Sequence, residues 1–245
     1  MIPALAPLLI ADFQHYRDVL VLPDDPRASV PLRTILTGDG LSDVLTRFGS
    51  AYPPSDPRGL ASLWSKHYFI KLIPPVVAAS LILDHRLPLH LDHLQLILDD
   101  NGLPAAFKLP DPGQHWTPAP VDAFARFDDV VEHHLRPFID AIARTVRLSP
   151  NVLWSNAGNY FEWLLGVLAN AMSHADLTHG HQLLNAGHLP DGRRNPLFQP
   201  VRYIEVDGRP ELKRQRRICC IRYRVSGVEL CDNCPLLHRR PDLTS

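Results

Sequence analysis

The stretch RQRRICCIRYRVSGVELCDNCP, residues 214–235, contains all four cysteines of the 245-residue sequence. Cys219 and Cys220 are adjacent, and after a ten-residue gap Cys231 and Cys234 form a C-x-x-C pair. Four cysteines placed at random along the chain would rarely fall in one such short window, so their clustering indicates a shared chemical role. Whatever the four sulfurs bind is therefore expected to determine how this stretch folds.

Three kinds of chemistry bring four cysteines together: disulfides, a zinc site and an iron–sulfur cluster. Disulfides are the least favoured, because no secretory signal is found and a cytosolic chain keeps its thiols reduced. Structural zinc sites usually take ligands in pairs with two to four residues between partners, whereas the first pair here has none. A [2Fe–2S] cluster needs two thiolates on each of two irons, so its ligands can approach over a broader front. The spacing places iron–sulfur ahead of zinc and leaves zinc as the rival.

The residues between the two cysteine pairs predict a β-hairpin. Residues 218–225 are rich in β-branched and aromatic side chains, residues 226–227 are a Ser-Gly turn signal, and residues 228–230 continue extended. Adjacent side chains of a regular strand point to opposite faces, so neighbouring cysteines share one site only where the backbone is irregular. Folding back at the turn would set these residues opposite one another: Arg222 with Cys231, and Cys219 and Cys220 with Cys234.

The C-C-x10-C-x-x-C arrangement, in the setting R-R-I-C-C-I-R-Y and C-D-N-C-P, resembles the C-terminal signature of the FhuF-type ferric siderophore reductases. The chain length and the position of the cysteines are also similar to that family. The resemblance implies a cytoplasmic [2Fe–2S] oxidoreductase that passes one electron to Fe(III) held in a siderophore of the hydroxamate type and releases Fe(II). It implies four cluster ligands: Cys219, Cys220, Cys231 and Cys234.

Two upstream segments, LWSK at residues 63–66 and LWSNA at residues 153–157, are similar to segments shared by these reductases and the FhuF-like part of siderophore synthetases. One rival hypothesis is therefore a condensing enzyme, which would need a nucleotide site. No Gly-rich phosphate loop or dinucleotide fingerprint appears, so electrons are expected from an external donor of the ferredoxin or flavin reductase type. The other rival is a structural zinc-binding or siderophore-binding protein without redox activity.

The composition excludes several other classes of function. The net charge of −1 and the pI near 6.9 give no basic field for nucleic acid. The apolar run at residues 1–10 is broken by two prolines and precedes an aspartate, so it predicts neither a signal peptide nor a membrane span. A cytoplasmic location is expected. Peripheral attachment to the inner face of a membrane is kept as an alternative, although the sequence shows no amphipathic anchor for it.

The predicted fold class is α+β, with a mainly helical body at residues 1–200, one or two β-hairpins, and a small C-terminal iron–sulfur module at residues 201–245. Apolar periodicity predicts a helix from Asp56-Pro57 that Pro74-Pro75 kinks or interrupts. Further predictions are a helix over 121–146 bent by Pro137, a central helix over 152–172, a strand over 89–98 that enters a hairpin at Asp100-Asn101-Gly102, and a strand over 201–206 with a turn at Asp207-Gly208.

Other candidate functional residues are basic or aromatic. Cations near an anionic cluster favour its reduction, although a run of charge is equally expected on a solvated strand edge. The cations in question are Lys213, Arg214, Arg216, Arg217, Arg222 and Arg224. Trp116 is the candidate for a siderophore groove, whereas core packing is expected for Trp154 and Trp163. The loop residues Arg193 and Arg194 are candidates for docking, and the histidines of a predicted loop at 179–181 are expected at the surface.

Overall fold

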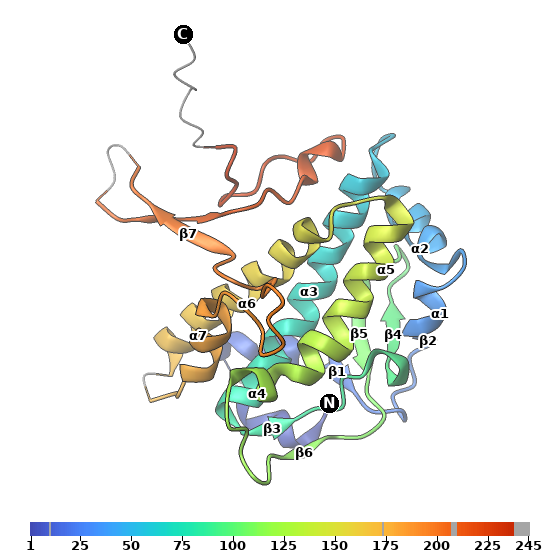
Figure 1. Ribbon diagram of the computed structural model, residues 1–245. Helices are drawn as coiled ribbons and strands as arrows, with labels where there is room; N and C mark the ends of the chain where they lie inside the picture. Colours follow the sequence, from blue (N-terminus) through green and yellow to red (C-terminus); the bar gives the residue numbers. More distant parts are fainter. Residues whose placement is uncertain (10, 173, 207–209, 238–245) are drawn as a thin grey trace.

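The computed structural model describes residues 1–9, 11–172, 174–206 and 210–237. A mainly helical body carries small sheets of two to four strands, which confirms the α+β class (Figure 1). In chain order the elements are η1 (Pro3–Leu8), η2 (Ala11–Tyr16), β1 (Leu20–Val21), β2 (Val30–Pro31), α1 (Leu32–Leu36), α2 (Gly40–Gly49), α3 (Pro57–Ile82), β3 (His85–Arg86), η3 (Leu91–His93), β4 (Gln95–Leu98), β5 (Pro104–Lys108), β6 (Gln114–His115), α4 (Ala123–Val130), η4 (Val131–Leu135), α5 (Arg136–Val146), α6 (Pro150–Ala171), α7 (Thr178–Asn185), β7 (Val201–Ile204), β8 (Lys213–Arg216) and η5 (Arg222–Arg224).

The centre of the body is formed by α3 and α6, which pack along each other and are buried on most sides (Figure 1). Apolar residues surround both helices, as expected for helices inside a core rather than on its surface. Trp154 of α6 is 4% exposed and packs in this core, as predicted. Trp163 is 37% exposed, so its predicted core position is wrong. Among the described residues, no helix has the length and apolar character needed to cross a membrane.

The start of α3 follows its sequence signals, whereas its middle does not. The Asp56 carboxylate accepts a 2.9 Å hydrogen bond from the Arg58 amide, and Pro57 occupies the first helical position. The predicted interruption at Pro74-Pro75 is wrong, because α3 continues through both residues. The two prolines are buried, and the burial of apolar surface around them offsets the backbone hydrogen bonds that they cannot donate.

The predicted helix over 121–146 forms as three consecutive segments, α4, η4 and α5. Asp122 caps it by accepting a 2.8 Å hydrogen bond from the Ala125 amide, so Val121 lies outside the helix. The middle segment η4 is a π-helical turn that ends directly before the turn containing Pro137. Proline lacks the amide hydrogen that would close the preceding α-helical turn, which explains why the helix widens at this point.

The hairpin predicted at Asp100-Asn101-Gly102 and the one that begins with the strand predicted over 201–206 are both present. β4 and β5 pair antiparallel within a four-stranded sheet of order β1-β5-β4-β2, and Gly102 adopts φ +76° in the connecting turn. The strand predicted over 89–98 is shorter, because the 3-10 turn η3 occupies its first half. β7 and β8 pair antiparallel in a second hairpin. The turn predicted at Asp207-Gly208 lies outside the described residues.

The segment at residues 179–181, predicted as a loop, lies in the helix α7. Gly180 is buried there, and a Cβ atom at this position would lie 2.6 Å from a methyl carbon of Leu165 in α6. The glycine that suggested a loop therefore permits close packing between two helices.

Candidate metal centre

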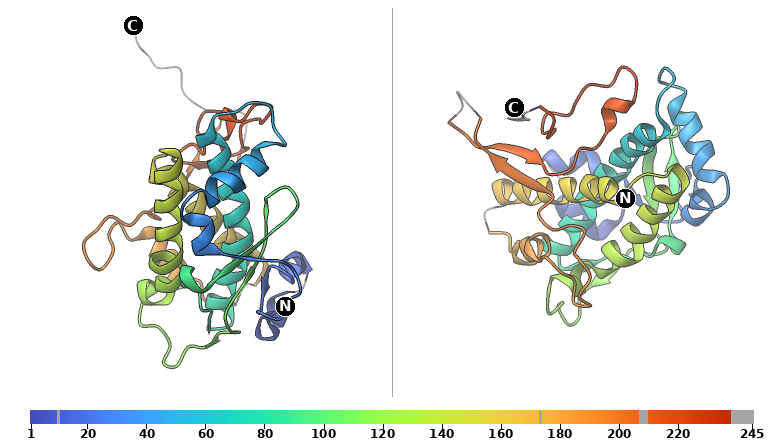
Figure 2. Two further views of the ribbon diagram at one scale, coloured as in Figure 1. Left: turned by 90° about the vertical axis from the view of Figure 1, so that its right-hand side faces the viewer. Right: turned by 45° about the horizontal axis from the view of Figure 1, so that its top comes forward.

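The cysteine-bearing tail follows the hairpin β7–β8 and runs across the body, first along α6 and then to the start of α3. Figure 1 shows it above these two helices, and the right-hand view of Figure 2 shows it crossing α6. Contacts along the tail follow the same order, from Arg214 on Asn159 to Arg224 on Asp56. The four cysteines therefore lie on the helical core.

The hairpin predicted between the two cysteine pairs is wrong. Residues 217–221 are irregular, and the next three residues form the 3-10 turn η5. Ile221 adopts φ 50° and ψ 16°, a left-handed conformation that a β-branched residue rarely accepts. Such strain persists only where surrounding contacts impose it, and it is concentrated at functional sites. The irregular backbone that adjacent cysteine ligands require is therefore present.

The four sulfur atoms lie close together in two pairs. The Sγ atoms of Cys219 and Cys234 are 3.9 Å apart, and those of Cys220 and Cys231 are 3.8 Å apart. These separations far exceed the S–S bond length of about 2.05 Å, and all four cysteines are free. Cys220, Cys231 and Cys234 are buried, whereas Cys219 is half-buried. Cys219 is therefore the cysteine through which the group of four sulfurs reaches the protein surface.

Backbone amides donate to one of the two pairs. The Ile221 amide donates to the Sγ of Cys219 at 3.3 Å, and the Leu236 amide donates to the Sγ of Cys234 at 3.4 Å. In each case the donor lies two residues after the cysteine. Hydrogen bonds of this kind stabilise the thiolate form. We call Cys219 and Cys234 the amide-side pair.

Two cations act on the other pair, Cys220 and Cys231, which we call the cation-side pair. The pKa of Cys220 is lowered by hydrogen bonds from Cys219 and Cys231 and by the positive charges of Arg216 and Lys66. The pKa of Cys231 is raised, first because its thiol donates to Cys220 and then because it is buried; Lys66 and Arg216 act in the opposite direction. Arg216 and Lys66 therefore favour the thiolate form of both members of this pair.

Burial and hydrogen bonds hold Arg216 in position. Its side chain is fully buried, and Nη2 donates to Ser155 Oγ at 3.3 Å and to Asn156 Oδ1. Its backbone amide donates to the Asn233 carbonyl at 2.9 Å, which joins the segment before Cys219 to the C-x-x-C loop. The Nε atom of Arg216 is buried without a hydrogen-bond partner.

Polar residues of α3 and α6 hold the backbone around the first cysteine pair. Ser62 Oγ donates to the Cys220 carbonyl at 2.5 Å, and Ser155 Oγ donates to the Ile218 carbonyl at 3.2 Å. Asn156 Nδ2 donates to Ser62 Oγ at 3.0 Å. These polar groups are buried at the junction of two otherwise apolar helices, where an unpaired group would be costly.

The tail is also fastened on both sides of the cysteines. On the α6 side, Arg214 pairs with Glu162 at 2.5 Å. On the α3 side, Arg224 pairs with Asp56 at 2.7 Å. A Cβ atom built on Gly59 of α3 would lie 2.9 Å from the Cβ of Arg224, so the absence of a side chain there permits the close approach of η5.

The remaining predicted basic residues of the tail serve mainly as anchors. Arg222 donates to the carbonyl oxygens of Glu229 and Leu230 at 2.6 and 2.9 Å, so it lies beside the segment that leads to Cys231, as predicted. Arg217 is exposed and donates to Gln199 at 2.7 Å. Lys213 lies in β8, the strand that leads into the tail.

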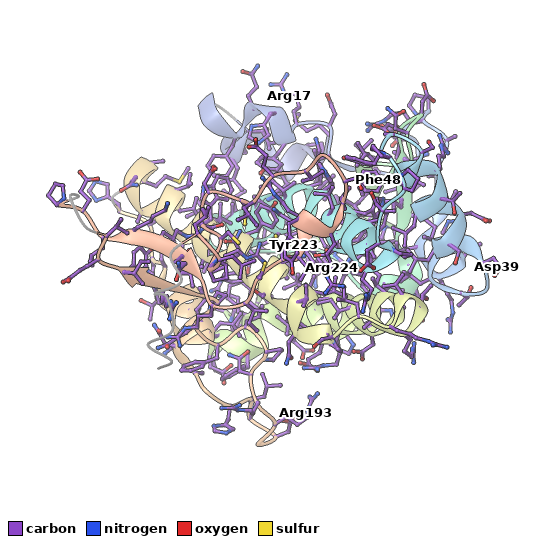
Figure 3. The ribbon with its side chains drawn as sticks, turned by 90° about the horizontal axis from the view of Figure 1, so that it is seen from above. Arg17, Asp39, Phe48, Arg193, Tyr223 and Arg224 are labelled. Atoms are coloured by element: carbon purple, nitrogen blue, oxygen red, sulfur yellow. The ribbon has the colours of Figure 1, made fainter. Side chains whose placement is uncertain are left out.

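Three predicted docking residues lie away from the cysteines. Trp116 follows β6, at the end of the body opposite the tail (Figure 1), and the Arg86 guanidinium lies 5.2 Å from its ring centroid. Arg193 pairs with Asp191 and Glu132 and lies at the edge of the view in Figure 3, whereas Tyr223 and Arg224 lie near its centre. Arg194 is exposed in the same loop. A role for these residues in docking stays a prediction.

Sequence reasoning missed the supporting residues Ser62, Lys66, Asn156 and Tyr160. Lys66 and Asn156 belong to the two segments, LWSK and LWSNA, whose similarity to the family had no assigned role. Burial raises the pKa of Tyr160 to about 12, and Cys220 and Cys231 contribute to this rise. The available signal was the presence of Ser, Asn and Lys within helices that are otherwise apolar.

Residues 62–211, more than half of the chain, match the family described as "Ferric iron reductase FhuF-like transporter", and residues 216–236 match the "FhuF 2Fe-2S C-terminal domain". The chain therefore belongs to the FhuF family, and its tail is a [2Fe–2S] domain. It is similar to the "Ferric siderophore reductase" of Escherichia coli (strain K12), with 28% identity over 178 residues. The match covers 72% of this chain and 65% of that relative.

The sulfur geometry fits a cofactor with two irons. Metal–sulfur bonds of about 2.3 Å at tetrahedral angles place two sulfurs on one metal roughly 3.8 Å apart, and both cysteine pairs have this separation. Among the described residues, no group of three or more His, Cys, Asp or Glu side chains is arranged to hold a single metal ion. Arg216, whose Nε has no hydrogen-bond partner among the described residues, adds positive charge that acts on Cys220 and Cys231. The residues present thus fit a [2Fe–2S] cluster.

Proposed function

We propose that this protein is a ferric siderophore reductase whose [2Fe–2S] cluster is held by Cys219, Cys220, Cys231 and Cys234. Such a cluster takes up and releases one electron at a time. The observation that carries the proposal is the arrangement of the four sulfurs in two pairs. The two Sγ atoms are 3.9 Å apart in one pair and 3.8 Å apart in the other, and one of the four cysteines, Cys219, reaches the surface. In this proposal residues 1–200 form the body and residues 201–245 the cluster module.

The proposed substrate is Fe(III) bound to a hydroxamate-type siderophore. Hard oxygen donors hold the trivalent ion more tightly than the divalent ion. Adding one electron to each ferric ion therefore releases Fe(II), and no bond of the chelator breaks. An external donor of the ferredoxin or flavin reductase type supplies that electron, and the proposed location is the cytoplasm. The reaction requires no acid–base residue.

The surface beside Cys219 is suited to contact with the siderophore or the electron donor. Ile218 and Tyr223, which lie within four positions of Cys219 in the sequence, are 40% and 45% exposed and offer apolar surface for such a contact. Figure 3 shows Tyr223 and Arg224 on the same face of the molecule. Because Cys219 is the half-buried ligand, this face gives the shortest route for an electron between the cluster and a docked molecule.

A hollow of about 500 Å3 lies beside this surface, between α6, α7 and β7. Arg202, Tyr203 and Arg217 are among its lining residues, and Arg217 lies two positions before Cys219. Guanidinium groups bind the oxygen atoms of an anionic or strongly polar chelate. We therefore place the siderophore at this hollow. Arg202→Gln should raise KM for the ferric siderophore while leaving the reduction potential of the cluster unchanged.

The test of the function uses the purified full-length chain. The protein should be reddish-brown, should contain about two irons and two sulfides per chain as a [2Fe–2S] cluster requires, and should bleach on addition of dithionite. After reduction it should convert a ferric hydroxamate to Fe(II), detected with a ferrous chelator. Cys231→Ser should abolish the colour and this activity while circular dichroism shows an intact helical body. A colourless protein that binds one zinc ion would refute the proposal.

A further inference from the structure

Arg216 is a buried cation without an acidic partner. Its side chain is 0% exposed, and within the described part of the chain its hydrogen-bond partners are the neutral groups of Ser155 and Asn156. Its Nε–H has no hydrogen-bond partner among the residues that the structure describes. A buried guanidinium needs compensating negative charge. The sulfur group is a source of such charge, because Arg216 acts electrostatically on Cys220 and Cys231.

Lys66 of α3 is a second cation on the same side, because it lies about one helical turn after Ser62, whose Oγ donates to the Cys220 carbonyl at 2.5 Å. Burial lowers the pKa of its ammonium group, and the charges of Cys220 and Cys231 act against that shift. No ion pair between Lys66 and a carboxylate is found in the described ranges of the chain, and its side chain is half-buried. One positive charge from the helix α3 and one from the strand β8 thus converge on the cation-side pair.

The two cysteine pairs are therefore in different electrostatic environments. The amide-side pair receives N–H donors from Ile221 and Leu236. The cation-side pair receives whole positive charges, and neither Arg216 nor Lys66 is among the main influences on Cys219. A whole charge in a site of low dielectric constant has a larger and longer-ranged effect than a single amide dipole.

We propose that Lys66 and Arg216 are the internal counter-ions of the cluster, and that they favour its reduction from the side of Cys220 and Cys231. This proposal rests on the proposed function, because it requires the four cysteines to hold the cluster. A centre with four thiolates, two irons and two sulfides has a net charge of about −2, and about −3 after uptake of one electron. Nearby fixed cations stabilise the more negative form and so raise the reduction potential.

The hydrogen bonds that Arg216 donates hold its positive charge in a fixed position. Asn156 accepts from the guanidinium through Oδ1 and donates to Ser62 through Nδ2, so the same amide orients the cation and the serine that holds the Cys220 backbone. The guanidinium cannot turn toward solvent without breaking this network. Arg216 and Lys66 are thus positioning residues that act on the potential and do not touch the substrate.

The test measures the midpoint potential of the cluster-bound protein in the absence of siderophore. The protein is titrated in the presence of mediator dyes, and its reduction is monitored by absorption and by electron paramagnetic resonance. Lys66→Gln and Arg216→Gln should each lower the equilibrium constant for reduction about tenfold, which for a one-electron couple is a shift of about 59 mV to more negative potential. Lys66→Arg keeps the charge and should retain most of the potential. Lys71→Gln removes a charge from the same helix and should leave the potential unchanged.

The outcomes separate the two proposals. If Lys66→Gln keeps its iron and sulfide content but has the wild-type potential, the counter-ion role is overturned and the reductase proposal stands. If the wild-type protein contains no [2Fe–2S] cluster, both are overturned. Should Arg216→Gln fail to assemble the cluster, Lys66→Gln still decides, because no hydrogen bond to the Lys66 side chain is found in the described structure. A shift that persists at high salt would support buried charges, which salt screens weakly.

Discussion

The Ser62 hydroxyl donates a 2.5 Å hydrogen bond to the backbone carbonyl of Cys220, although the two residues are 158 positions apart in the sequence. Asn156 donates to the same hydroxyl at 3.0 Å. One serine oxygen therefore joins α3, α6 and the cysteine-bearing tail. The cluster domain shares the hydrogen-bond network of the helical core, so changes in the core are expected to reach the metal site.

Ser62→Ala should weaken retention of the cluster. The variant leaves the buried Cys220 carbonyl without its donor, which costs about 1–3 kcal/mol. We expect faster loss of colour in the presence of an iron chelator and a lower midpoint in urea unfolding. Ser50→Ala, which removes an exposed hydrogen bond to the Arg47 carbonyl, is the control and should change neither. Equal behaviour of the two variants would contradict the proposed link.

Gly59→Ala should displace η5 from α3. The added Cβ would lie 2.9 Å from the Cβ of Arg224 and 3.1 Å from its carbonyl carbon, neither of which is the free end of a flexible side chain. Replacing glycine by alanine in a helix interior normally stabilises the helix by about 1 kcal/mol. Gly166→Ala in α6 is the control, because the added Cβ meets nothing within 4 Å. We therefore expect Gly166→Ala to raise Tm and Gly59→Ala to lower it. A rise in Tm for both would show that the tail is not held close to Gly59.

Asn156→Asp should make the cluster harder to reduce. The substitution keeps the shape of the side chain but places a carboxylate against the Arg216 guanidinium, which neutralises its charge and removes the donor to Ser62. We expect a more negative midpoint potential in the redox titration. Asn151→Asp, at an exposed position near the start of the same helix, adds the same charge and should leave the potential unchanged. A shift of equal size in both would point to a long-range effect of net charge.

Stability should fall as the pH drops from about 6.5 to about 4, partly because of His134. Burial lowers the pKa of this side chain from 6.5 to about 4, with His90 adding to the effect and the hydrogen bond to the Leu89 carbonyl opposing it. The folded protein holds the ring neutral, with Nδ1 donating to Leu89 and Nε2 accepting from Tyr68. Over this pH range the His134 side chain binds a proton in the unfolded chain but not in the folded chain. The free energy of unfolding therefore falls by about 3 kcal/mol by pH 4.

His134→Gln should flatten this pH dependence. The measurement is the free energy of unfolding in urea at several pH values between 4 and 7, compared with the wild-type protein. The variant is expected to be less stable at pH 7, because the hydrogen bonds of a buried ring are altered, yet to lose less stability on acidification. An unchanged slope would mean that other groups govern the acid response.

Local signals in the sequence were sufficient for the elements that depend on local contacts. Asp56-Pro57 marked the start of α3, and Asp100-Asn101-Gly102 marked the turn between β4 and β5. The spacing of the four cysteines favoured an iron–sulfur cluster over zinc, and the resemblance to the FhuF family decided for a [2Fe–2S] cluster, which the family comparison supports. The residues that carry each of these signals lie within a single short stretch of the sequence.

The remaining features depend on contacts between distant parts of the chain. β-Branched residues around Cys219 suggested a strand, but hydrogen bonds to Ser62 and Ser155 hold this backbone in an irregular path. Gly180 suggested a loop because its role, close packing against Leu165, is visible only once α6 and α7 are placed. Lys66 gave no signal beyond its presence in an otherwise apolar helix, since its importance comes from two cysteines more than 150 positions further along.

The order of the anchoring segments in the sequence has a consequence for biosynthesis. Both α3 and α6 precede the tail, so a ribosome completes them before the cysteines emerge. Chains of this size tend to fold from the N-terminal side during synthesis. The scaffold that receives the tail is then expected to form before any of the cysteines is available, so that iron and sulfide would be loaded onto helices that have already folded.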